Sequence, residues 1–349
     1  MSTRHTPALN ATVAEKRLSM SYILPIRSAK PTGPELIAYV RWLSARCETI
    51  IIDGSSPEVF AANALAWAGA AVHVPPSPSL ATPMGKVGGV LTGVSLATHE
   101  HLVIGDDDVR YDAAALHAMH TYLDGADVVR PQNYFSPLPW HACWDTGRTL
   151  LNRMSGGDWP GTLGVRRSAL MRTDGYDGAA MFENLELVRT VRTSGGTESI
   201  PLDLYVARRP STASHFLSQR VRQAYDELAR PARLGVQLAV LPLCVVAWHH
   251  FGWSGVGVLA ICVAAIAEIG RRRAGGMRHF PFVASLLAPA WLAERAVCSW
   301  LAVGARVVLG GVPYRGRILS HAATPMPVLQ ARFSNLRRTS STEAPRRSA

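Results

Sequence analysis

The feature that most constrains the fold is a short, wholly apolar run that ends in acids. Residues 102–105 read Leu-Val-Ile-Gly, and Asp106, Asp107 and Asp108 follow directly. A continuous apolar run of this length is typical of a parallel strand that is buried on both faces. Because ligands of open α/β sheets collect at the carboxyl ends of such strands, we expect the three acids to face a crevice.

The three adjacent carboxylates repel one another and favour a cation. Hard divalent ions such as Mg²⁺ or Mn²⁺ take oxygen ligands from one or two carboxylates together with substrate phosphates. The alternate spacing of Asp106 and Asp108 lets both side chains approach one metal ion, while Asp107 points elsewhere. The pattern predicts a metal site that binds a diphosphate. A solvated loop with an acidic helix cap is the alternative, because Asp is also common at turns and N-caps.

The segments around the acids predict an α/β fold. Two short apolar runs, residues 21–26 and 49–52, are separated by helical spacing over residues 34–47. A strand, a helix and a strand in this order predict a right-handed βαβ unit and a parallel sheet. Further helices are expected over residues 61–69 and 87–97, and further strands over residues 71–74, 128–129 and 163–165.

These elements predict a doubly wound α/β head over residues 19–230, preceded by a flexible N-terminus over residues 1–18. The head contains neither G-x-G-x-x-G nor G-x-x-x-x-G-K-[ST], so dinucleotide-binding and P-loop functions lose their main support. The first twenty residues contain no apolar core of signal-peptide length. We therefore expect the head to stay in the cytosol.

The chain becomes apolar after residue 230. Residues 234–248 carry no charge, residues 249–253 read His-His-Phe-Gly-Trp and predict a turn, and residues 254–269 are apolar apart from Glu268. With flanking positions added, each stretch approaches the roughly 20 residues that span a bilayer. We expect a membrane hairpin over residues 233–270. A buried helical pair in a soluble protein is the alternative.

A third apolar stretch, residues 280–309, is interrupted by Pro289 and by the charged pair Glu294-Arg295. Because a charged pair is costly in hydrocarbon, this stretch predicts a re-entrant or interfacial helix. The membrane-associated region is thus predicted over residues 231–310, followed by a basic tail over residues 311–349. Arginines flank both outer ends of the hairpin and none lies at its turn, so both ends are expected in the cytosol.

The net charge of +11 raises the question of nucleic acid. Much of the excess lies beside the apolar stretches and in the tail, where anionic lipid is the expected partner. No basic and aromatic strand motif of the RNA-binding kind accompanies it. The charge therefore predicts a cytoplasmic-membrane location with no nucleic-acid partner.

Other polar residues follow predicted strands or begin predicted helices. Asp53 closes the second strand, where its carboxylate can accept hydrogen bonds from a base or a ribose hydroxyl. Lys86 is a point charge suited to a diphosphate, and Glu183 and Glu186 begin a predicted helix. Each also has a structural alternative: a turn former at Asp53, a solvated charge at Lys86, and first-turn acids favoured by the helix dipole.

A polar pair lies just before the apolar region. Gln219 and Arg222 are three residues apart on a predicted helix, so they share one face. They can contact a substrate in the crevice. Binding of lipid headgroups alone is the alternative for a basic helix above a membrane.

In order and spacing these motifs resemble family 2 glycosyltransferases with a GT-A fold. The resemblance is to the membrane-anchored branches, namely the lipid-glycosylating, ceramide-glucosyltransferase-like enzymes and the processive synthases. The D-G-S turn of the family matches residues 53–55, and its D-x-D metal motif matches residues 106–108. Its E-D base motif falls on Glu183-Asn184, and its Q-x-x-R-W motif falls on residues 219–223. The match covers about residues 19–230, and residues 314–317 resemble the post-membrane segment of some members.

The resemblance implies an inverting single displacement from a nucleotide sugar, with UDP as the family expectation, to a lipid or membrane-bound acceptor. It implies a divalent cofactor, Mn²⁺ or Mg²⁺, held by Asp106 and Asp108. The remaining implied roles are donor binding by Asp53, Lys86, Asp106 and Asp107, acceptor or diphosphate binding by Gln219 and Arg222, and catalysis by Glu183, Asn184 and Glu186.

Two residues depart from the family pattern. Asn184 stands where the family has its catalytic Asp, and Gln223 stands where it has Trp. An amide is no general base, so the proton must go to Glu183, to Glu186 or to a base that the acceptor brings, while a phosphate acceptor needs none. A catalytically degenerate membrane scaffold stays open. So does a sugar nucleotidyltransferase, although its glycine-rich N-terminal triphosphate loop is missing.

Overall fold

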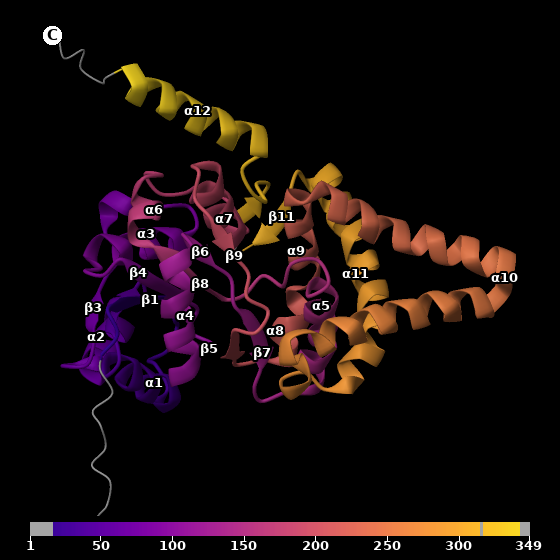
Figure 1. Ribbon diagram of the computed structural model, residues 1–349, viewed down its shortest axis with the longest axis horizontal. Coiled ribbons are helices and arrows are strands. Elements are labelled where there is room, and N and C mark those ends of the chain that lie inside the picture. The colour runs from indigo at the N-terminus through magenta and orange to yellow at the C-terminus, as the bar shows by residue number, and fades with distance from the viewer. Residues whose placement is uncertain (1–16, 315–316, 343–349) are drawn as a thin grey trace, which may run out of the picture.

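The computed structural model describes residues 17–314 and 317–342, and its centre is a seven-stranded sheet in the order β3-β2-β1-β4-β8-β6-β9 (Figure 1). Its strands are β1 Met20–Ile26, β2 Glu48–Asp53, β3 Val72–Val74, β4 His101–Gly105, β6 Val128–Val129, β8 Thr162–Arg166 and β9 Glu198–Ser199. The first four strands in chain order, β1 to β4, run parallel to one another.

The expected parallel sheet is mixed at β8, which runs antiparallel to both β4 and β6. The chain enters β8 beside the carboxyl end of β4, where the Asp106 N–H donates to the Gly161 carbonyl at 2.9 Å. The predicted strand at β8 covered only residues 163–165, a run too short to indicate strand direction, so the sequence pattern could not predict the reversal.

Helices cover both faces of the sheet, as a doubly wound head requires. Alternating strand residues supply the two cores: Tyr22 and Leu24 point to one face and Ile23 to the other. The first face is covered by α1 Pro34–Ser44, α2 Pro57–Trp67 and α4 Ala113–Gly125. The second is covered by α3 Gly85–Leu96, α6 Arg167–Met171 and α7 Glu183–Thr193, with the short η1 Pro78–Leu80 packed against α3.

Glycine allows α3 to lie close to the sheet. A Cβ atom on Gly93 would overlap the Ile23 side chain, whereas one on Gly85, at the start of the same helix, would meet nothing within 4 Å. The close packing of the middle of α3 on the sheet therefore requires glycine at position 93. This packing places the first turn of α3, which carries Lys86, near the end of β4.

A smaller sheet lies beside the acid triplet. It has the order β5-β10-β7, with β5 Val109–Arg110, β7 Gln132–Phe135 and β10 Tyr205–Arg208. The chain then continues through α8 Ala213–Ser218, α9 Arg220–Tyr225 and η2 Asp226–Ala229 toward the long C-terminal helices. Helix α5 Trp140–Asn152 packs against these C-terminal helices.

The long helix α10 Pro231–Arg272 projects from the head as a hairpin (Figure 1). Gly252, with φ 62° and ψ −155°, reverses the chain inside the predicted turn. The stretch Pro231–Arg278, which includes η3 Arg273–Arg278, is the one helical segment of the described residues long and apolar enough to cross a membrane, by length and composition. Many of its exposed side chains are large and apolar, among them Val236, Leu243, Phe251, Trp253 and Ile261.

Helix α11 Phe282–Leu309 is continuous through Pro289 and through the charged pair. Arg295 is buried, and Glu294 forms two hydrogen bonds, both 2.6 Å long, with the Arg220 guanidinium. Large apolar side chains of the opposite face are exposed, among them Phe282, Leu286, Trp300 and Leu301. The charges that were costly for a membrane span thus face the head, and the apolar face of α11 points outward.

The C-terminal segment returns to the head. Strands β11 Val312–Tyr314 and β12 Arg317–Leu319 pair antiparallel, and α12 Met326–Thr342 follows. Between them, the His321 and Ala322 carbonyls accept from the Met181 and Phe182 N–H groups, just before α7. Most of the predicted flexible N-terminus (residues 1–16), the end of the predicted tail (343–349) and residues 315–316 of the 314–317 patch lie outside the described residues.

Candidate active site

The acid triplet lies at the edge of a cavity of about 320 Å³ between the end of β4, the start of α7, and helices α5, α8 and α9. Asp106 and Asp108 line this cavity, whereas Asp107 is exposed and lies outside its lining. Gly161 permits a close approach here, because a Cβ atom on it would press on the Asp106 carboxylate at 3.0 Å.

Two cations neutralise the acids. Lys86 Nζ lies 2.5 Å from Asp106 Oδ1 and 2.7 Å from Glu183 Oε1. Arg208, at the end of β10, lies 2.8 Å from Asp108 Oδ2 and 3.7 Å from Asp106 Oδ2. Burial alone would lower the pKa of Lys86, but the two carboxylates more than offset it and raise that pKa. Lys86 therefore stays charged and joins the first turn of α3 to the site.

The same geometry leaves acceptor capacity for a metal ion. Asp108 Oδ1 is buried and accepts no hydrogen bond from any described residue. The atoms that Asp106 and Asp108 offer to a metal ion are carboxylate oxygens, which are the ligands that hard divalent cations prefer. Asp106 and Asp108 thus fit the predicted metal.

The predicted catalytic residues separate in the structure. Glu183 and Asn184 line the cavity, and Asn184 Nδ2 donates to the Pro160 carbonyl at 2.9 Å. Glu186 is fully buried away from the cavity lining, and its Oε2 accepts from the Thr324 N–H at 2.8 Å. Position 186 faces the C-terminal segment because the first turn of α7 spreads its acids around the helix axis.

The predicted donor and acceptor residues also divide. Gln219 and Arg222 line the cavity, together with Gln223. Asp53 does not: it is the buried last residue of β2, and it accepts from the Ser55 N–H at 2.9 Å and from Asn63 Nδ2 at 2.8 Å. Burial would raise the pKa of Asp53, and hydrogen bonds from Asn63 and Ser55 lower it below its usual value.

A buried ion network that the sequence motifs did not reveal forms another wall. Arg148 lies 3.1 Å from both Asp145 and Asp158, and Arg220 Nη1 lies 2.9 Å from Asp145 Oδ1. Burial would raise the pKa of Asp145, but Arg148 and Arg220 hold it well below its usual range. The available signal was an Asp and an Arg three residues apart on a helix, which equally describes a solvated surface pair.

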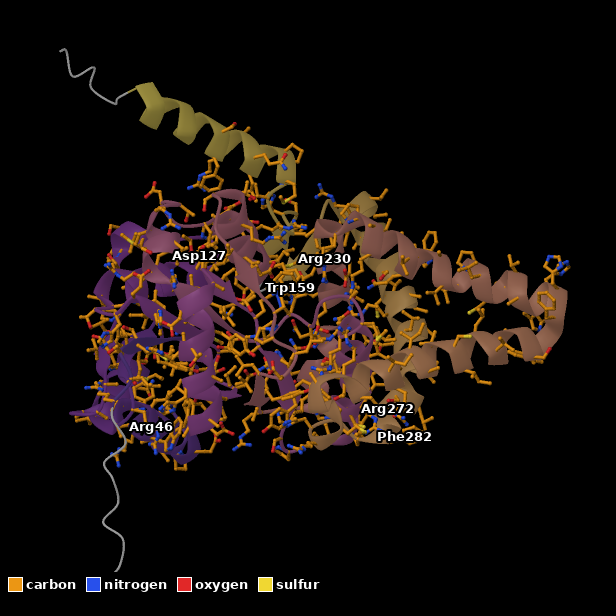
Figure 2. All side chains as sticks on the ribbon, viewed as in Figure 1. Arg46, Asp127, Trp159, Arg230, Arg272 and Phe282 are labelled. Atoms are coloured by element: carbon orange, nitrogen blue, oxygen red, sulfur yellow. The ribbon has the colours of Figure 1, made fainter. Side chains whose placement is uncertain are left out.

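Charge of both signs surrounds the cavity. The lining arginines are Arg148, Arg208, Arg209, Arg222, Arg230, Arg233 and Arg295, and the lining acids are Asp106, Asp108, Asp145, Asp158, Glu183, Asp226 and Glu227. Arg230 lies beside Trp159 in Figure 2, with its guanidinium carbon 5.9 Å from the Trp159 ring centre and 5.2 Å from that of Phe182. Such a wall can bind a cation, an anion and a flat or apolar group.

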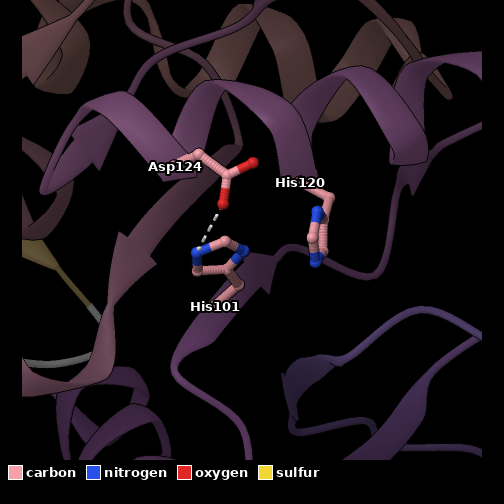
Figure 3. Close-up of side chains that lie close together, drawn as sticks. All are labelled: His101, His120 and Asp124. Atoms are coloured by element: carbon pink, nitrogen blue, oxygen red, sulfur yellow. Dashed lines mark ion pairs between the residues drawn. The ribbon is translucent and has the colours of Figure 1, made fainter.

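A separate cluster lies at the opposite end of β4 (Figure 3). One ligand atom each from His101, His120 and Asp124 lies within 4.8 Å of the others, and His101 Nε2 is 3.6 Å from Asp124 Oδ1. Burial, and then the neighbouring His120, lowers the pKa of His101. Imidazole donors suit zinc-like ions better than Mg²⁺, so the cluster differs from the acid site in both place and chemistry.

No protein-family model and no curated protein matches this chain. Among solved structures, the chain is similar to the mannosyltransferase PcManGT from Pyrobaculum calidifontis in complex with GDP-Man and Mn²⁺, with a TM-score of 0.48 and 16% sequence identity. The match covers 84% of this chain and 90% of that chain. A likeness at this level does not establish a shared fold, so the function of this chain rests on its own residues.

Proposed function

We propose that this protein is a membrane-anchored glycosyltransferase of the GT-A type. It moves a sugar from a nucleotide diphosphate donor to a lipid or membrane-bound acceptor, in one metal-assisted displacement that inverts the anomeric centre. The observation that carries the proposal is the cavity at the carboxyl end of β4, which Asp106 and Asp108 share with Glu183, Gln219 and Arg222. Ligands of α/β sheets bind at such ends, and acids there call for a cation.

The chain's own residues position and stabilise the donor. Lys86 is held between Asp106 and Glu183, close to the expected diphosphate, and Arg222 lines the same cavity. Negative charge develops on the departing diphosphate, so cations that are already in place lower the barrier most. Held by Asp106 and Asp108, Mn²⁺ or Mg²⁺ would add charge stabilisation for that leaving group.

The acceptor is proposed from the helices beside the cavity. Arg230 and Arg233, which flank the start of α10, line the cavity, so its mouth lies next to the base of the apolar hairpin. The exposed apolar side chains of α10 and α11 form a surface that favours an apolar partner, such as the interior of a membrane. We infer that α10 enters the cytoplasmic membrane, that α11 lies along its surface, and that the head meets amphiphilic acceptors on the cytosolic side.

Donor turnover tests the proposal. The full chain in detergent is offered UDP- and GDP-linked sugars with Mn²⁺, with Mg²⁺ and with a chelator, and the release of nucleoside diphosphate is measured. We expect release from one donor class and its loss on chelation. Release of pyrophosphate from a nucleoside triphosphate would instead favour a sugar nucleotidyltransferase.

Two observations keep a non-catalytic membrane scaffold as the second candidate. Asn184 replaces the expected base, and Arg208 contacts both Asp106 and Asp108, where a metal is expected. A scaffold would bind nucleotide without releasing product from any donor, even with membrane lipid extract added. Chelator-sensitive turnover would exclude it.

A further inference from the structure

Asn184 leaves the proton of a hydroxyl acceptor without an assigned base, and most acids of the cavity are already paired. Glu183 is bound by Lys86 at 2.7 Å, and Asp158 by Arg148 at 3.1 Å. Glu227 lies 2.8 Å from Arg230. A carboxylate held by a cation is a weaker proton acceptor, so these acids are poorly suited to take the proton.

Asp226 differs from these acids. It is the first residue of η2, directly after α9, and it lines the cavity four residues beyond Arg222. Its Oδ1 atom is buried and accepts no hydrogen bond within the described part of the chain. The Asp226 carboxylate also forms no ion pair there. A buried acceptor oxygen without a donor is rare and calls for an explanation such as a ligand proton.

We propose that Asp226 is the general base of the transfer and that the acceptor is therefore a hydroxyl compound rather than a phosphate. This inference rests on the proposed function. The acceptor hydroxyl gives its proton to the Asp226 carboxylate, and its oxygen forms the bond to the anomeric carbon. The bond from that carbon to the donor phosphate oxygen breaks, and the nucleoside diphosphate leaves with the electron pair.

The electrostatic surroundings of Asp226 agree with this role. The pKa of Asp226 is raised to about 7, because burial and the charges of Glu183 and Glu227 together outweigh the opposing charges of Arg222 and Arg230. Arg233, at the start of α10, also faces the same cavity. A base with a pKa near the working pH accepts a proton most effectively. Below about pH 7 the carboxyl carries its own proton, so transfer should rise with pH through this value.

The test compares Asp226→Asn, Asp226→Glu and the control Asp174→Asn in the full chain in detergent, with the donor found by the turnover assay and lipid extract as acceptor. Asp174 is exposed and has a positive φ of 53°, a conformation that Asn tolerates, so this variant should behave as wild type. We expect Asp226→Asn to lower kcat/KM by about 10²- to 10⁴-fold and to lose the acidic limb of the pH profile.

Nucleotide binding by Asp226→Asn should be unchanged, whereas a merely structural loss would weaken it. Asp226→Glu should keep an acidic limb at a shifted pH, which tests the role even where the amide variant fails to fold. Wild-type turnover with the same pH profile in Asp226→Asn, or full-rate transfer to a phosphate lipid by that variant, would overturn the assignment of Asp226 alone. Absence of turnover by the wild type with every donor would overturn the proposed function as well.

Discussion

The head and the α10 hairpin use similar apolar residues in opposite ways. In β4, Leu102 and Val103 are fully buried, whereas in α10 Val236 and Ile261 are 66% and 71% exposed. Five residues of β4 are enclosed by helices on both faces of the sheet, but the arms of α10 project beyond the head. Apolar composition therefore predicts burial only where a partner surface exists. The base of α10 packs against α11 and α5, whereas the exposed apolar side chains of its projecting arms lack such a partner within the described chain.

Helix α11 joins these two regions. Its charged pair faces the head through Arg220 and Gln223, while its apolar face points outward like that of α10. A group of buried polar contacts thus lies between α5, α9 and α11, next to the cavity. If this comparison is right, removing a charge should impair turnover or stability at the head and its junction with α11. Adding a charge to the apolar surface should impair membrane association of the hairpin.

The largest effect is expected at the acid site. Asp108→Asn removes a carboxylate ligand of the proposed metal ion. It should lower the metal-dependent turnover of the nucleotide sugar on the order of 10³-fold, because the charge on the leaving group loses its stabilisation. The matched control is Asp107→Asn, since Asp107 is exposed and outside the cavity lining. Nucleoside diphosphate release with and without Mn²⁺ measures both. Equal losses in the two variants would contradict the assigned geometry.

The junction should show the next largest effect. Arg220→Met leaves Glu294 and Asp145 without their shared partner and should destabilise the chain by about 3 kcal/mol, as expected when one member of a buried ion pair is removed. Arg172→Met is the control, because Arg172 is largely exposed and its ion pair with Asp127 is long, at 3.8 Å. Such an exposed pair contributes about 1 kcal/mol or less. Thermal unfolding in detergent measures the difference. Similar shifts would mean that the network adds no stability.

The hairpin should respond to charge in membranes. Ile261→Lys places a cation near the middle of the second arm of α10 and should weaken insertion by about 2.5 kcal/mol. Leu65→Lys, on the 81% exposed Leu65 of α2, is the control and should leave membrane association unchanged. Co-sedimentation with vesicles of mixed anionic lipid reports both. Unchanged association of Ile261→Lys would show that α10 does not enter the bilayer.

The smallest effect concerns packing. Gly93→Ala forces a methyl group into Ile23 and should cost about 1–3 kcal/mol by overpacking. Gly257→Ala in α10 meets nothing within 4 Å and should be neutral, or stabilising by about 1 kcal/mol through helix propensity. Unfolding midpoints of the two variants separate a packed helix from an unpacked one. Equal destabilisation would mean that α10 packs against a partner at Gly257.

Local patterns predicted much of the architecture. The apolar run that ends in Asp106, the βαβ order of the first strands and the turn around Gly252 each depend on residues close together in the chain, so their periodicity and punctuation were readable. The direction of β8 was not, because a short apolar run pairs in either sense. Six residues that the motifs singled out line one cavity, namely Asp106, Asp108, Glu183, Asn184, Gln219 and Arg222, whereas Asp53, Lys86, Asp107 and Glu186 are not among its lining residues. The chemical roles assigned to them stay predictions.

By itself the sequence determined where the first strands and helices of the head form, which stretch is apolar enough for a membrane, and which motifs carry acids and bases. It did not predict α4, α5, β7 or β10. Only the tertiary structure decided that Arg208 contacts the acid triplet, that Glu186 faces the C-terminal segment and that Asp226 keeps a buried oxygen without a donor. The physical reason is that pairing and burial of a charge depend on groups from distant elements. No local pattern specifies which of those groups meet.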